Sequence, residues 1–509
     1  MSEMAASEGI PPFVSQTMIA ERAAPIKTTG FVGFIRTRLL NTPGNIILTL
    51  LGIALIYLTV VPSVKFLLID AVWTGADRNA CLAKDGTAVG ACWPFIQAKF
   101  QQFVYGFYPA EARWRVNLTF VLAIVLLVPL LIPKLPAKAL NAGLFFVALP
   151  VVAFFLLHGG GIKGFGIAWT EGALFSIANG IVSGGTALAQ STSLPGLAQL
   201  VYALGMGISL IGYALAIVLY PLTLIKTLIQ SLGQPVWADL AATAIVVSTI
   251  MFFLSGGFRN GWRALTTSLA IFAGIAVVIA AMGLDKGGLA IVDTRLWGGL
   301  LVTLVVSVTG IVTSMPVGIA LALGRRSTIP LIRVFSVAFI EFWRGVPLIT
   351  VLFFATYMLP LFLPGNFTVD GLVRVLIGIA LFAGAYNAEV IRGGLAALSR
   401  GQSEAASALG LSYWKTTGLV VMPQALRHVI PGLVNSFIAL FKDTSLVSIV
   451  ALFDLLGQLR ASFADPVWST PNTLFTGFAF TGMVYFVFCF GMSRYSLFVE
   501  RRLNAHRRS

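Results

Sequence analysis

Long, nearly uninterrupted apolar runs recur along most of this chain, and they restrict it to few folds. Hydrophobic residues make up 58% of the 509 residues and charged residues only 10%, a balance typical of proteins that cross a membrane several times. The runs can cross about 30 Å of hydrocarbon as helices, which pair their backbone amides internally. The alternating ten-residue segments of an outer-membrane barrel are not seen. We therefore expect an all-α polytopic membrane protein.

The basic residues give a net charge of +15 and stand where apolar runs end. This placement is typical of the cytoplasmic segments of membrane proteins, so it favours a role in topology over nucleic-acid binding. The clusters are Arg36 with Arg38, Lys134 with Lys138, Arg259 with Arg263, Arg325 with Arg326, and Arg501 and Arg502 with Arg507 and Arg508.

These clusters predict twelve spans with both termini in the cytoplasm. The block 159–285 must cross the membrane an even number of times; we expect four crossings, with two as the alternative, which gives ten spans in all. Residues 1–30 lack the apolar core of a signal peptide, so the first run acts as an uncleaved anchor. The expected spans are about 46–69, 117–133, 139–158, 164–190, 196–228, 238–256, 264–283, 297–323, 331–359, 371–392, 431–452 and 474–497.

This topology divides the chain into five regions. Glycines 159, 161 and 164 have a G-x-G-x-x-G spacing, but no strand precedes them, so we interpret them as sites of close helix packing. The regions are a cytoplasmic segment 1–45, three helices in 46–158 with a periplasmic loop 70–116, a membrane block 159–285 of two to four helices, a transmembrane domain 286–499 with a cytoplasmic loop 393–430, and a basic tail 500–509.

Two of the three cysteines share the loop that we place outside the membrane. Cys81 and Cys92 are eleven residues apart, and an oxidising compartment would allow them to form a disulfide. Two separate thiols are the alternative.

The cytoplasmic loop 393–430 has the signals of two short helices. We expect Ser403 to cap a helix over 404–409 and Gly410 to end it in a left-handed turn. Ser412 is expected to cap a second helix, after which Pro423 and Pro431 break the chain. Ala405 and Ala406 keep the first helix slim, and Glu404 gives it one negative charge. The pattern favours a knob that docks into another protein over an ordinary connector.

Ionisable residues in apolar runs usually face protein or a water-filled path. Lys442 and Asp443 lie in the run 431–452, and Asn435 is on the same helix face as Lys442. A substrate path could use Lys442 for a carboxylate, and Asp443 or Glu389 for an ammonium group. The alternative is that Lys442 and Asp443 form ion pairs that hold helices together.

Two further pairs have the i,i+3 spacing of local ion pairs near the cytoplasmic face. Glu341 with Arg344, and Glu389 with Arg392, are expected to couple helix ends. No metal-binding cluster and no G-x-x-x-x-G-K-[ST] phosphate loop is found. We therefore expect no cofactor on this chain.

The loop resembles the EAA loop of ABC-importer permeases. The matching residues are Glu404, Ala405, Ala406, Gly410 and Pro423. Other motifs over about 295–500 resemble the branch that takes up polar amino acids. They are Trp297 to Leu304, Glu341 with Arg344 to Leu348, Ala385 to Gly394, Pro423 to Ala425, and Lys442 to Leu446.

The amino-terminal part resembles the larger permease subunit of general L-amino-acid transporters. The similarity lies in the anchor, Cys81 and Cys92, and the loop that ends in Arg113, Trp114 and Arg115. Residues 160–285 depart from that pattern and look like an added membrane block.

The resemblance implies a type I ABC-importer permease core of five transmembrane helices, preceded by additional helices, in a bacterial inner membrane. It implies an ATP-driven, binding-protein-dependent importer of L-amino acids in which this chain is not an enzyme. The implied partners are a second permease subunit, two ATPase subunits that carry ATP and Mg²⁺, and a periplasmic binding protein. An ion-coupled secondary transporter and a non-transporting membrane scaffold are the alternatives.

Overall fold

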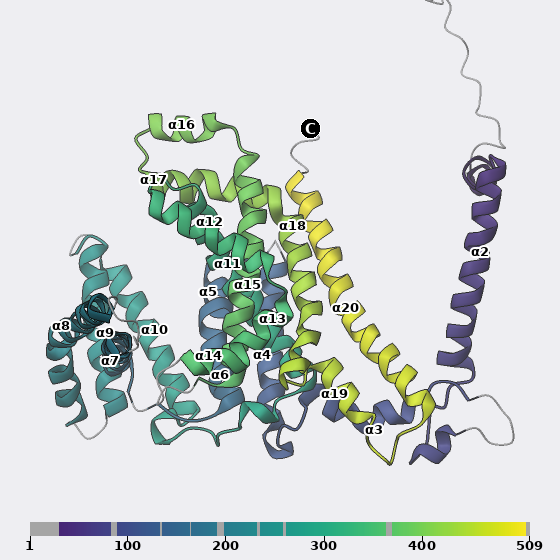
Figure 1. Ribbon diagram of the computed structural model, residues 1–509, viewed down its shortest axis with the longest axis horizontal. Coiled ribbons are helices and arrows are strands. Elements are labelled where there is room, and N and C mark those ends of the chain that lie inside the picture. Colours follow the sequence, from purple (N-terminus) through teal and green to yellow (C-terminus); the bar gives the residue numbers. More distant parts are fainter. Residues whose placement is uncertain are drawn as a thin grey trace, which may run out of the picture. The chain divides into compact units, whose positions relative to one another are not determined.

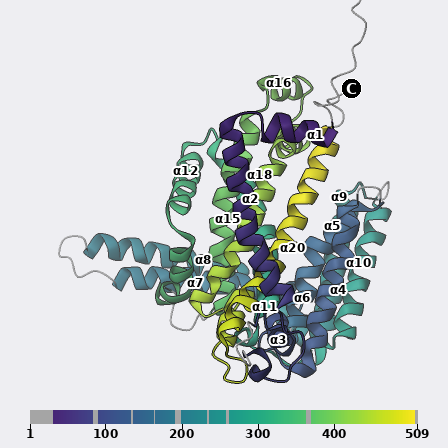
Figure 2. The same ribbon diagram turned by 90° about the vertical axis from the view of Figure 1, so that its right-hand side faces the viewer.

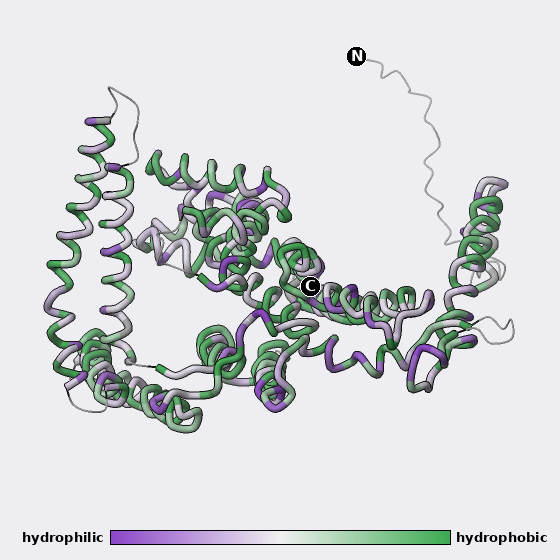
Figure 3. Tube along the Cα trace, turned by 60° about the horizontal axis from the view of Figure 1, so that its bottom comes forward, coloured by the Kyte–Doolittle hydropathy of each residue, from purple (hydrophilic) through white to green (hydrophobic). Residues whose placement is uncertain are grey.

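The computed structural model describes residues 30–82, 89–132, 135–162, 164–190, 198–231, 235–257, 261–362 and 369–504. Within these ranges the secondary structure is helical, with isolated bridges and no β-strand, as Figure 1 shows. Apolar residues cover the long helices, and hydrophilic residues gather in the connections (Figure 3). Lys134, Arg259, Arg507, Arg508 and the first part of the segment 1–45 lie outside the described residues.

Eleven helices of the described chain are long and apolar enough to cross a membrane, or twelve if one bent pair counts as a single span. The expected all-α polytopic fold is confirmed, and the count agrees with twelve spans better than with ten. The spans are Pro43–Ile69, Ala110–Leu131, Leu140–His158, Gly166–Gln190, Gln199–Gln230, Pro235–Leu254, Trp262–Ala281, Gly299–Arg325, Gly371–Ala396, Tyr413–Val450 and Pro471–Arg502, with Pro330–Gly345 and Leu348–Phe362 as the bent pair.

Of the described residues, 30–82, 89–95 and 467–476 form one compact unit. Its long helix α2 (Pro43–Val64) starts where the Thr42 side chain accepts a hydrogen bond from the Asn45 amide, with Pro43 in the first turn. No residue of α2 is buried, as expected for a helix whose side chains contact lipid. The unit also contains α1 (Gly30–Phe34) and the first residues of α3 (Trp93–Tyr105) and α20 (Pro471–Asn504).

Residues 96–466 and 477–509 form the second unit. Its helices are α4 (Arg113–Leu131), α5 (Lys138–Gly143), α6 (Leu149–His158), α7 (Gly166–Gln190), α8 (Ala198–Gln230), α9 (Pro235–Leu254), α10 (Trp262–Ala281), α11 (Gly299–Arg325), α12 (Pro330–Gly345), α13 (Leu348–Phe353), α14 (Leu359–Phe362), α15 (Gly371–Ala396), α16 (Arg400–Ala408), α17 (Tyr413–Lys415), α18 (Met422–Asp443) and α19 (Leu455–Ser462), followed by most of α20.

The block α7–α10 satisfies its buried charges internally. The Asp239 carboxylate accepts hydrogen bonds from the amides of Phe165, Ile167 and Ala168, at the start of α7. Glu171 of α7 and Lys226 of α8 form an ion pair of 2.6 Å. Helices α7 and α8 also touch through their backbones, because a Cβ atom on Gly205 would lie 2.4 Å from the Ala189 nitrogen.

Helices α11, α15 and α18 form the core of the second unit. Val306, Ile379 and Leu440 belong to one buried cluster. Ala322, Ala388 and Ala425 belong to a second buried cluster nearer the other end of these helices. The small side chains in the second cluster allow the helices to approach closely.

The span expected over 331–359 consists of two helices with a sharp bend between them. Helices α12 and α13 meet at an angle of 103°. The bend falls at Gly345, Val346 and Pro347, where Val346 has an extended backbone. A residue before proline avoids the helical conformation, and this preference explains the break.

Candidate coupling loop and translocation face

The loop between α15 and α18 begins with α16, which starts earlier than the sequence indicated. Ser399 occupies the N-cap position without a side-chain bond, and the Ser403 hydroxyl donates to the Arg400 carbonyl at 2.8 Å. The prediction that Ser403 caps a helix over 404–409 is therefore wrong. Because the helix starts at Arg400, Ser403 lies inside its first turn, where a serine hydroxyl can bond backward.

Gly410 follows α16 with a φ of +74°. Glycine adopts this left-handed conformation without a steric cost. The Gly410 amide donates to Ser407 and the Leu411 amide donates to Ala406, so carbonyls at the end of the helix find partners. The left-handed turn that the sequence predicted at Gly410 is confirmed.

The second helix of the loop continues into α18. Ser412 is the N-cap residue of α17 but makes no side-chain bond, and residues 416–421 connect α17 to α18 as a π-helical turn. Pro423 lies in the first turn of α18, and Pro431 lies inside that helix. The predictions of breaks at both prolines and of a span that starts at 431 are wrong, because a proline removes only one hydrogen bond and long helices can tolerate it.

The tip of the loop presents one acidic and several apolar side chains. Ala406 is buried, whereas Glu404 and Ala405 are exposed. Leu409, Tyr413 and Trp414 are 82%, 60% and 74% exposed. Figures 1 and 2 both show α16 beyond the ends of α15 and α18. These three residues were not predicted as part of the site, although large apolar side chains in a polar segment are a signal that the sequence carries.

A cluster of ion pairs joins the ends of α11, α12 and α15. Arg325 contacts Glu341 at 3.0 Å and Glu389 at 3.3 Å. Glu389 also pairs with Arg392 at 2.5 Å, the spacing-based pair that we expected. The charges therefore connect three helices.

The expected pair between Glu341 and Arg344 is not formed. Glu341 bonds Arg325 instead, and the Arg344 guanidinium lies over the Tyr386 ring at 5.7 Å from its centre. The reason lies in the tertiary structure, because Arg325 at the end of α11 reaches Glu341 across the contact between α11 and α12. Sequence analysis used Arg325 only as a topology signal.

Helix α18 carries a polar face. Asn435 and Lys442 are exposed and seven residues apart, and exposed His428 lies seven residues before Asn435. Asp443 is half-buried. Within the described residues, the side chains of Lys442 and Asp443 form no ion pair or hydrogen bond. Within the described residues, neither side chain therefore forms an ion pair that joins helices.

A buried polar network lies near the start of α11. Asp454 is fully buried and caps α19, accepting bonds from the amides of Leu456 and Gly457 and from the Tyr485 hydroxyl. Burial raises the pKa of the Asp454 carboxyl, and the bonds from Gly457 and Tyr485 oppose this change. The Thr303 hydroxyl accepts from the Leu455 amide at 3.0 Å. The sequence analysis missed this network, for which the only local signal was an aspartate before a short helix.

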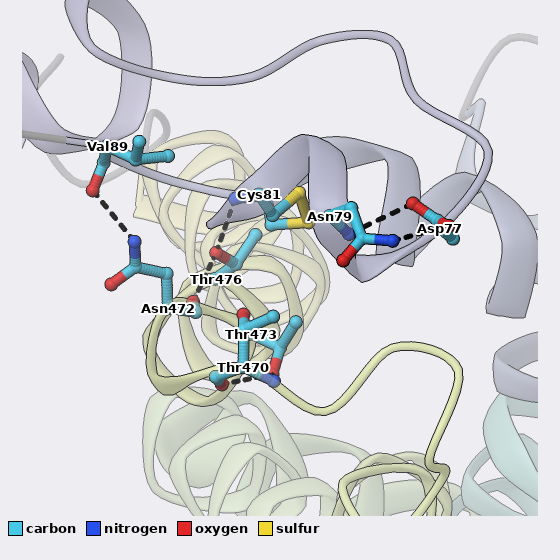
Figure 4. The surroundings of a disulfide bond; sticks show 9 residues. Asp77, Asn79, Cys81, Val89, Thr470, Asn472, Thr473 and Thr476 are labelled. Carbon is cyan, nitrogen blue, oxygen red and sulfur yellow. Dashed lines mark hydrogen bonds between the residues drawn. A yellow bond between two sulfur atoms is a disulfide. The ribbon is translucent and has the colours of Figure 1, made fainter. Parts of the chain in front are cut away.

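In the first unit, a disulfide joins Cys81 and Cys92, both of which are buried. The Cys92 amide donates to the Thr476 hydroxyl at 2.9 Å, and the Asn472 side chain donates to the Val89 carbonyl at 2.8 Å (Figure 4). The disulfide thus joins two parts of the loop that follows α2. The second of these parts is also hydrogen-bonded to residues at the start of α20.

These features define a polytopic membrane protein with an exposed helical loop between α15 and α18. The family of binding-protein-dependent transport system inner membrane components matches residues 314–505, which contain the ion-pair cluster, the loop and α18. The inner membrane amino-acid ABC transporter permease protein YhdY of Escherichia coli (strain K12) is 35% identical over 474 residues, 93% of each chain. The chain therefore belongs to the family of amino-acid ABC transporter permeases and is a multi-pass inner-membrane component, as its motifs predicted.

Two other relatives show how the chain is built. The glutamate/glutamine/aspartate/asparagine transport system permease protein BztC of Rhodobacter capsulatus is 37% identical over 502 residues, 97% of this chain and 99% of BztC. The glutamate/aspartate import permease protein GltK of Escherichia coli O157:H7 is 33% identical over 209 residues, 40% of this chain and 91% of GltK. This chain is thus similar to BztC over nearly its full span, whereas GltK corresponds to about two fifths of it. That residues 160–285 are an added membrane block stays a prediction.

Proposed function

We propose that this chain forms one half of the pore of an ATP-driven importer for L-amino acids of broad or polar specificity. A second permease subunit, identical or different, completes the pore. A periplasmic binding protein delivers the amino acid, and two ATPase subunits dock on the cytoplasmic side. ATP and Mg²⁺ bind to the ATPase subunits, so this chain needs no cofactor and hydrolyses nothing. BztC is a permease for glutamate, glutamine, aspartate and asparagine, and these polar substrates of a relative support polar specificity.

The observation that carries this proposal is the connection between the loop and the polar face of α18. Helical structure continues from Tyr413 to Val450. Glu404 lies on α16, which contacts residues 416–421 at the start of this stretch. A movement of α16 is therefore passed to the helix that carries Asn435 and Lys442. An ATPase that closes on the tip can move the substrate path without contacting it.

The orientation follows from the same geometry. The C-terminal end of α20 and α16 lie at the same end of the core in both views (Figures 1 and 2). Arg501 and Arg502 in the last turn of α20 favour the cytoplasm. With an even number of spans, we propose that the amino terminus lies in the cytoplasm as well.

The polar face of α18 is the proposed contact with substrate. The Lys442 ammonium suits the carboxylate of an amino acid, and Asp443 suits its ammonium group. Glu389 is a weaker candidate for binding the ammonium group, because its carboxylate already forms ion pairs with Arg325 and Arg392. Glu389 and Glu341 instead keep the ends of three helices together while the loop moves.

The test is the substitution Glu404→Lys in the full transporter. We expect it to weaken co-purification of the ATPase subunits, while the amount of chain in the membrane is unchanged. Glu111→Lys is the matched control, because Glu111 is also exposed and lies on the opposite side in the proposed topology. Equal ATPase recovery with native chain and with Glu404→Lys would refute docking at this loop.

A further inference from the structure

A pocket of about 310 Å³ lies where α11 and α15 end. Arg325, Arg326, Arg392 and Ala396 line it. Three of the four residues that line this small volume are therefore arginines, and no carboxylate is among the lining residues. Such an arrangement attracts an anion, because arginine forms two parallel hydrogen bonds to carboxylate or phosphate.

The charges around the pocket do not cancel. Arg325 and Arg392 share their positive charge with Glu341 and Glu389. Arg326 has no carboxylate within ion-pair distance among the described residues, and its guanidinium donates only to the Leu395 carbonyl at 3.3 Å. Arg326 is also exposed. One positive charge of the pocket is thus free to bind an anion from outside the chain.

The neighbouring helix points to the source of that anion. Helix α12 packs against the end of α11 through Ile340 and Ala322. Its first turns expose Leu331 (79%), Val334 (64%) and Phe335 (63%). In the single chain, an apolar surface next to an arginine pocket matches the boundary between acyl chains and headgroups of a bilayer.

We propose that the arginine pocket binds a phosphate group at the inner membrane surface, carried by the headgroup of an anionic phospholipid. Free phosphate has the same chemistry and is the other source. The proposal rests on the proposed orientation, which places 324–326 in the cytoplasm, but not on transport. A bound headgroup adds negative charge beside Arg325 and Arg392. It therefore changes the electrostatic environment of the ion pairs that connect α11, α12 and α15.

The experiment is a titration of the full chain, purified in detergent and stripped of lipid, followed by native mass spectrometry. The probes are phosphatidylglycerol, phosphatidylcholine and inorganic phosphate, each added separately. We expect phosphatidylglycerol to bind more tightly than phosphatidylcholine. Arg326→Ala should weaken phosphatidylglycerol binding roughly fivefold, the effect of one arginine near an anionic membrane surface, and Arg326→Lys should retain most of it.

Arg333→Ala is the matched control. Arg333 is an exposed arginine on α12 that does not line the pocket, so its loss removes the same charge nearby and should leave the affinity unchanged. Phosphate binding that depends on Arg326, without preference for phosphatidylglycerol, supports the site with free phosphate as its ligand. Equal losses in the two alanine variants, or no binding that depends on Arg326, overturn the proposal. Because uptake is not measured, failure here leaves the transport function untouched.

Discussion

The hydroxyl of Tyr485 on α20 donates a 2.9 Å hydrogen bond to the carboxylate of Asp454, which caps α19. Thr303 on α11 accepts a bond from the amide of Leu455, the next residue. The consecutive helices α19 and α20 therefore meet α11, which is distant in sequence, around one buried carboxylate. We expect this junction to hold the end of the core opposite the coupling loop.

Tyr485→Phe removes one donor to this carboxylate and leaves the packing of the ring in place. A hydrogen bond to a buried charged group contributes about 1.5–3 kcal/mol, so the variant should unfold at a lower temperature. Thermal unfolding of the purified chain in detergent measures this. Tyr495→Phe is the control, because the Tyr495 hydroxyl has only a 3.4 Å bond to a backbone carbonyl. Equal melting temperatures for Tyr485→Phe and the native chain would show that the bond contributes little.

The raised pKa of Asp454 predicts a dependence of stability on pH. In the unfolded chain the carboxyl titrates near its usual 3.8, and in the folded chain it titrates higher. Between these two pKa values the folded state binds more protons, so the contribution of Asp454 to stability falls as pH rises through that window. Melting temperatures against pH should show this fall in the native chain and a smaller one in Asp454→Asn. Parallel curves for the two proteins would contradict the prediction.

Lys442→Ala should reduce uptake in a transporter that still assembles. The loss of one charge-assisted bond to a substrate carboxylate corresponds to about 1.5–3 kcal/mol, or roughly ten- to a hundredfold in apparent affinity. Uptake of labelled amino acid by proteoliposomes measures it, with co-purification of the partner subunits as the assembly check. Lys286→Ala, at an exposed lysine in a connecting segment, is the matched control. Unchanged uptake kinetics in Lys442→Ala would exclude a substrate contact.

Cys81→Ser should destabilise the first unit. A disulfide that closes a short loop contributes about 2–4 kcal/mol, mainly by restricting the unfolded chain. Limited proteolysis should cut the loop that contains Cys81 faster in the variant. Mass spectrometry after alkylation provides the direct check, since the native chain should gain two labels at Cys81 and Cys92 only after reduction. Labelling of both cysteines without reductant would show that the bond does not form in the cell.

Local chemistry in the sequence was sufficient for much of the fold and for part of the site. The apolar runs predicted the spans, because a segment in hydrocarbon must bond its own backbone. Gly410 predicted the left-handed turn, because that conformation is easiest for glycine. The same runs and motifs also indicated the family.

Other features depended on contacts between distant segments. The predicted ion-pair partner of Glu341 was wrong, because its actual partner Arg325 comes from a different helix. The 103° bend at Gly345 to Pro347 was not predicted, because hydropathy does not report the direction of a helix. Helix α18 continues through Pro431 because the rest of that helix outweighs one missing bond.

The sequence alone determined which segments enter the membrane and where the coupling loop turns, because both follow from the chemistry of neighbouring residues. Only the tertiary structure decided which charges meet. It paired Arg325 with Glu341, buried Asp454 under Tyr485 and left Lys442 without a partner in the described chain. Such pairings depend on how helices cross, and local sequence does not specify the crossings.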